Sequence, residues 1–91
     1  MTIYMITYQL NSNNKNYDNI IKSIKDSSYC GCNFCEYSYL VNSSLTAKEI
    51  TDNITPYLED EDKLIVIEVT SNCQGWLLEK EWDYIHKKIF S

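Results

Sequence analysis

The N-terminal stretch constrains the fold most, because residues 2–10 (TIYMITYQL) carry an unbroken β-strand pattern without Gly or Pro. Apolar, aromatic and β-branched residues fill it, which is typical of strands. Alternate residues form two faces, one with Ile3, Met5, Thr7 and Gln9 and the other with Tyr4, Ile6, Tyr8 and Leu10. Both faces are mostly apolar, so we expect a central strand that is covered on at least one side.

The rest of the chain can be arranged as layers around this strand. Further strand patterns follow it, and helix signals separate them. These signals are a stripe of apolar residues at helical spacing, a Thr46–Glu49 capping box and Pro56, which ends a helix. The predicted order is a helix over 17–27, a short strand or irregular loop over 28–35, a strand over 36–42, a helix from 46 to 55, a strand over 63–70 and a helix over 77–90. This order predicts one domain, residues 1–91, with a ferredoxin-like α+β fold: an antiparallel sheet, two helices on one face and a C-terminal helix.

The charge of the chain is acidic and uneven. The formal net charge is −5, and residues 36–70 carry two lysines against eight acids. There is no arginine, the residue whose bidentate fork suits phosphate and guanine. These features disfavour a nucleic-acid binder with a broad basic face. They fit a protein that meets a partner with a basic surface, or they simply favour solubility.

Four cysteines raise the question of a metal site. No segment is long enough to span a membrane and the N-terminus lacks a signal-peptide layout, so we expect a cytoplasmic protein with reduced or metal-bound thiols. Cys30, Cys32 and Cys35, with Cys73 or His86 as a distant ligand, are candidates for a structural zinc site. Reduced thiols without a metal, or a redox switch among neighbouring thiols, are the alternatives. His86, in a lysine-rich last turn, is expected to be a surface residue.

Two further groups are candidates for contact with a ligand or partner. The acidic run of residues 59–62 could hold a hard cation, although a solvated turn explains it as well. Trp76 and Trp82 could stack on a ring, and Trp82 could instead pack the last helix on the sheet. With eight tyrosines in 91 residues, some aromatic side chains must reach the surface, where they are suited to protein contacts.

Four stretches of the chain carry a family resemblance. In order they are MITYQLN, YSYLVNSSLTAKEI, PYLEDEDKLIVIEVT and GWL followed by WDYI. Together they resemble the small SinR-like proteins, which are related to VapD-type ribonucleases and to the small nuclease-like subunit of the CRISPR adaptation complex. The resemblance covers nearly the whole chain. It implies a ferredoxin-like fold and a homodimer built through the sheets.

The chain departs from this family where its nucleases hold their metal. There the resemblance implies a Tyr-Asp pair at the end of the first strand, with the two Asp of a dimer binding a metal ion. This sequence has Tyr8 and Gln9, and a neutral amide does not replace an anionic ligand. Asn11 does not replace it either. We therefore expect no metal-dependent nuclease, no catalytic residue and no cofactor beyond the possible zinc.

The function expected from sequence is binding without catalysis. The acidity, small size and nuclease-like plan suggest a phage or mobile-element protein that inhibits or accompanies a CRISPR-type host defence system by protein contact, an anti-CRISPR role in the host cytoplasm. The alternatives are an endoribonuclease of the VapD or CRISPR-adaptation type and a nucleic-acid-binding dimer. The expected contact residues are Tyr8, Gln9, Asn11, Glu59, Asp60, Glu61, Asp62 and Trp76.

Overall fold

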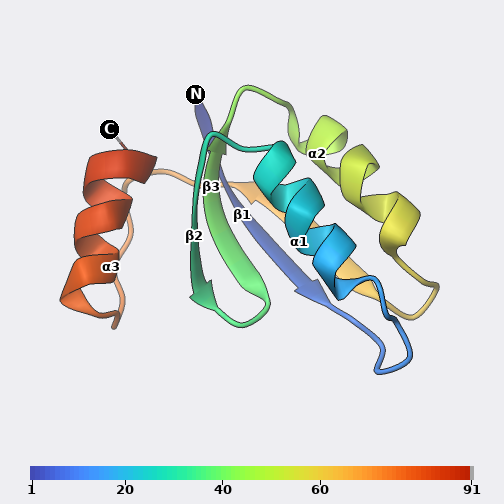
Figure 1. The fold of residues 1–91 in the computed structure, drawn as a ribbon. Helices are drawn as coiled ribbons and strands as arrows, with labels where there is room; N and C mark the ends of the chain where they lie inside the picture. The colour runs from blue at the N-terminus through green and yellow to red at the C-terminus, as the bar shows by residue number, and fades with distance from the viewer. Residues whose placement is uncertain (91) are drawn as a thin grey trace.

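A computed structural model describes residues 1–90 of the chain. Four strands and three helical segments, two of them extended by short 3₁₀ and π turns, follow one another along it (Figure 1). In chain order they are β1 (Thr2–Gln9), α1 (Tyr17–Asp26), β2 (Cys30–Cys35), β3 (Ser38–Ser43), α2 (Ala47–Ile54), η1 (Thr55–Tyr57), β4 (Lys63–Glu68), α3 (Glu79–Tyr84) and η2 (Ile85–Ile89).

The four strands form one antiparallel sheet in the order β2-β3-β1-β4. Strand β1 lies between β3 and β4, as its two apolar faces predicted, and α1 and α2 lie side by side over one face of the sheet (Figure 1). This order of elements and strands is that of a ferredoxin-like α+β fold, so the predicted fold class is confirmed.

The main core lies between the sheet and the two helices. Strand β1 contributes Tyr4, Ile6 and Tyr8, which the alternation had placed on one face. The remaining buried members are Ile20, Ile24, Tyr39, Val41, Ile50 and Ile54. We call the opposite side of the sheet, away from α1 and α2, the open face. Its odd-numbered β1 residues from Ile3 to Thr7 are only half-buried.

The helix formed by α3 and η2 contacts the open face at its β2 end (Figure 1). Ile85 and Ile89 are buried there, which agrees with the predicted apolar stripe. The Asn42 side-chain amide donates to the carbonyl oxygens of Lys88 at 3.1 Å and Ile89 at 3.4 Å, which fixes the helix end to β3. None of the helices within residues 1–90 combines the length and apolar character that crossing a bilayer requires.

Local signals placed the element boundaries to within about two residues, although β4 ends at Glu68 and not at 70, and α3 begins at Glu79 and not at 77. The Thr46–Glu49 capping box is present, and α2 ends at Ile54 as Pro56 predicted. Residues 30–35 form a strand, one of the two predicted alternatives, with a bulge between Cys32 and Cys35. The predicted strand over 36–42 was wrong at its start: β3 begins at Ser38, because Asn33 donates to the carbonyls of Cys35 and Ser38 and closes a turn.

Candidate functional site

The end of β1 presents two neighbouring side chains on opposite sides. Gln9 is exposed, whereas Tyr8 is 2% exposed and belongs to the core. The Tyr8 ring packs edge-on against Tyr37 at 5.6 Å, and burial is the main cause that raises the pKa of its hydroxyl. Among the described residues this hydroxyl has no hydrogen-bond partner. Tyr8 is therefore a packing residue, and of the pair only Gln9 is presented for contact.

Asn11 and the acidic turn come together, although about fifty residues separate them in sequence. The Asn11 backbone amide donates to Asp62 Oδ1 at 2.6 Å, and its side-chain amide donates to Glu61 Oε2 at 2.6 Å. Asp62 Oδ2 accepts from the Glu59 amide at 2.8 Å and from the Asn14 side chain. The loop that follows β1 is thus tied to the turn that precedes β4.

These hydrogen bonds assign Asp62 a structural task. The backbone amides of Asn11 and Glu59 hold the pKa of its carboxyl below the ordinary value. Its oxygens are thereby used inside the chain, while Glu59, Asp60 and Glu61 stay exposed around an open hollow of about 490 Å³. The turn is a solvated acidic surface that Asp62 holds in place.

The cysteines are spread along β2 and the loop after β4. Cys30 and Cys32 pair with Asn42 and Leu40 of β3, whereas Cys35 follows the bulge. No group of three or more His, Cys, Asp or Glu side chains within residues 1–90 is placed to hold a metal ion. The zinc site at Cys30, Cys32, Cys35 and Cys73 stays a prediction from sequence alone.

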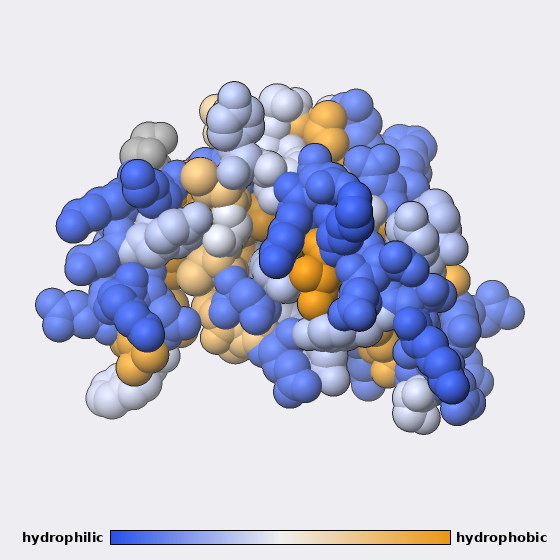
Figure 2. All heavy atoms as spheres, viewed as in Figure 1, coloured by the Kyte–Doolittle hydropathy of each residue, from blue (hydrophilic) through white to orange (hydrophobic). Residues whose placement is uncertain are grey.

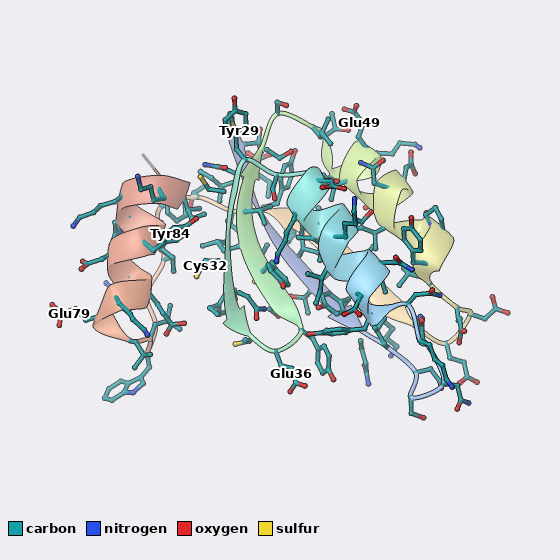
Figure 3. The ribbon with its side chains drawn as sticks, in the orientation of Figure 1. Tyr29, Cys32, Glu36, Glu49, Glu79 and Tyr84 are labelled. Atoms are coloured by element: carbon teal, nitrogen blue, oxygen red, sulfur yellow. The ribbon has the colours of Figure 1, made fainter. Side chains whose placement is uncertain are left out.

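The C-terminal helix shields part of this cysteine row. Tyr84 of the helix lies on the side that faces Cys32 of β2 (Figure 3). Burial raises the pKa of the Cys32 thiol, and the nearby Glu81 adds to the effect. A raised pKa lowers the fraction of reactive thiolate, so Cys32 is suited to packing more than to redox chemistry.

An apolar groove lies between the open face and the C-terminal segment. Its volume is about 640 Å³. Met5, Phe34 and Leu40 line it from the sheet, and Trp82, Ile85 and Phe90 line it from the helix and the chain end. Figure 2 shows apolar surface between β2 and the C-terminal helix, beside the hydrophilic outer side of that helix. We call this feature the groove.

Trp76 is the most exposed aromatic side chain of the described residues, at 100%, and it belongs to the groove lining. Trp82 is half-buried, stacks on His86 with ring centroids 5.6 Å apart and packs against the Gly75 backbone. Of the two tryptophans, Trp82 thus packs the helix and Trp76 is free for a partner. A fully exposed indole beside an apolar groove is a typical protein-contact anchor.

Sequence reasoning selected Trp76 and Trp82, and it named Cys35 and Cys73 as possible metal ligands, but it missed the sheet side of the groove. Met5, Phe34 and Leu40 sit in ordinary strand patterns, and only the packing of the C-terminal segment joins them into one surface. The one available signal was the second apolar face of β1, for which the sequence predicted no definite cover. Comparisons with protein-family models, with curated proteins and with solved structures gave no match for this chain.

Proposed function

We propose that this chain is a non-catalytic protein-interaction domain that holds a segment of its partner in the groove. The observation that supports it most is the fully exposed Trp76 at an apolar groove of about 640 Å³. Monomeric proteins keep few contiguous apolar surfaces of this kind unless a partner covers them. Trp76 would be the anchor, with Met5, Phe34 and Leu40 as the floor.

The charge of the chain supports a partner with a basic surface. The net charge is −5, Glu68 belongs to the groove lining, and Glu79, Glu81 and Asp83 lie on the adjoining α3. Complementary charge steers encounter and selects among partners. The resemblance to SinR-like proteins makes a nucleic-acid-binding subunit of a CRISPR-type defence complex the specific partner that we propose, with this chain acting as a phage or mobile-element inhibitor or companion. From the same resemblance we propose that it works as a homodimer.

Binding to purified subunits of such a complex tests this function. Biolayer interferometry would compare the wild type with Trp76→Ala, which removes the anchor, and with Tyr29→Ala. Tyr29 is a matched control because it is 78% exposed and lies outside the groove lining. We expect Trp76→Ala to weaken binding at least about tenfold and Tyr29→Ala to leave it unchanged. Equal affinity of Trp76→Ala and the wild type would contradict the groove as the binding site. Absence of binding to every subunit would contradict the proposed partner.

An RNA-cleavage assay separates this function from the endoribonuclease alternative. β1 ends at Gln9, which has no carboxylate, and the Glu61 and Asp62 carboxylates that reach Asn11 from the acidic turn are hydrogen-bonded within the chain. We expect purified protein with magnesium to leave RNA intact. Cleavage that a chelator abolishes would contradict a purely binding role.

A further inference from the structure

The two edges of the sheet differ in how they are protected. At one edge, β2 is contacted by the C-terminal helix and carries a bulge between Cys32 and Cys35. At the other edge, β4 pairs with β1 in unbroken register from Lys63 to Glu68, and no strand of the described residues lies on its outer side. An unprotected regular edge is a template for a further strand.

The hydrogen-bond pattern shows which backbone groups this edge offers. The Val69 amide donates to the Ile3 carbonyl at 2.9 Å, so Ile3 and Val69 form a bonded pair. Bonded and non-bonded pairs alternate in an antiparallel ladder, which makes Ile67 and Ile65 the next residues bonded to β1. The N–H and C=O groups of Leu64, Val66 and Glu68 therefore point outward, away from β1.

Building on the homodimer proposed above, we infer that two copies join edge to edge through β4, antiparallel about a two-fold axis that passes beside Val66. In this register Val66 faces Val66 of the partner subunit, and Leu64 faces the partner's Glu68. All three outward residues of each strand are then paired, with about six backbone hydrogen bonds. A register shifted by two residues would pair one of these three residues with a partner residue that lies outside β4.

The side chains of β4 fit the same register. Ile65 and Ile67 are 54% and 45% exposed on the open face. In this register Ile65 faces the partner's Ile67, and Ile67 faces the partner's Ile65. Cross-strand apolar pairs stabilise such a ladder. The two charges of the strand, Lys63 and Glu68, lie at opposite ends and face Val69 and Leu64 of the partner subunit, so no like charges oppose each other. A second copy is thus the occupant that this edge fits.

Sedimentation velocity over a concentration series tests the association, and amide exchange by NMR tests the edge. We expect a species of twice the 10.7 kDa chain mass that grows with concentration. In parallel, the amides of Leu64, Val66 and Glu68 should become protected, whereas those of Ile65 and Ile67 are protected at every concentration. A dimer with these three outward amides unprotected would overturn the β4 register but keep the homodimer. A monomer at all concentrations would overturn both.

Exposed side chains provide the matched variants. Ile67→Lys places a charge opposite the partner's Ile65 without entering the main core, and we expect the dissociation constant to rise at least about tenfold. Tyr29→Lys likewise places a lysine at an exposed position, outside both β4 and the groove, and should leave the dimer unchanged. Unaltered association of Ile67→Lys would contradict the β4 interface. Because the partner-binding test uses Trp76, the failure of either proposal can be recognised separately.

Discussion

Two tyrosines on the same face of β1 differ in the partner of their hydroxyl. Tyr4 Oη donates to the Leu45 carbonyl at 2.8 Å, whereas the buried Tyr8 Oη has no partner among residues 1–90. We expect Tyr8→Phe to raise the free energy of unfolding by about 1 kcal/mol, because it removes an unsatisfied polar group. Tyr4→Phe should lower it by about 1 kcal/mol, because it deletes a hydrogen bond. Urea unfolding measures both, and equal destabilisation would show that Tyr8 Oη is bonded.

Asp62 should make stability depend on pH in acid. Its pKa is lower in the folded chain than in the unfolded one, since the backbone amides of Asn11 and Glu59 stabilise the carboxylate. It therefore stabilises the fold above about pH 4, its unfolded pKa, and that contribution is lost as the pH falls through the folded value. Urea midpoints of the wild type and Asp62→Asn should differ at neutral pH, begin to converge below about pH 4 and meet once the pH is below the folded-state pKa.

A neighbouring acid provides the control for that titration. The Asp60 carboxylate makes no hydrogen bond within residues 1–90, so Asp60→Asn should keep the wild-type urea midpoint at neutral pH. An unchanged midpoint in Asp62→Asn as well would show that the tie between the post-β1 loop and the acidic turn does not stabilise the fold.

At the scale of elements, helix α2 depends on its N-terminal cap. Thr46 Oγ1 accepts from the Glu49 amide at 3.1 Å, and Glu49 Oε1 accepts from the Thr46 amide at 3.1 Å. We expect Thr46→Ala to lower the free energy of unfolding by about 1 kcal/mol and Thr46→Ser to retain most of it. Thermal unfolding followed by circular dichroism checks this pair, and a loss in Thr46→Ser equal to that in Thr46→Ala would contradict a cap-based cause.

Local patterns predicted these elements well, and distant contacts explain what they missed. Some features depend only on residues that are close in sequence, so they can be predicted from it. These are the two faces of β1, the Thr46 cap and the end of α2 before Pro56. The hydrogen bond between Asn11 and Asp62 joins residues that are 51 positions apart, and no local periodicity of the sequence encodes it. Asn33 likewise overrides the strand propensity of Tyr37 by closing a turn.

At the scale of the whole molecule, the net charge of −5 opposes association of two copies. Added salt screens this repulsion, so we expect the proposed homodimer to become tighter as ionic strength rises. Sedimentation velocity at low and high salt measures the change. Binding to nucleic acid would respond in the opposite direction, because it depends on releasing counterions. A dimer that weakens with salt would therefore contradict an interface formed mainly by β4 backbone and isoleucine contacts.

The separation between the main core and the C-terminal segment has an evolutionary consequence. The residues that close the core or pack against it extend no further than Val66, while Ile85 and Ile89 are buried elsewhere, under the last helix. Residues 69–90 supply one wall of the groove, and their buried side chains pack on the open face and not in the main core. Under the function proposed above, mutations at exposed positions of that segment, such as Trp76, would alter which proteins the domain recognises and leave the main-core residues in place. Homologous proteins could thus keep the same fold while substitutions in the last quarter of the chain adapt the groove to a partner that changes.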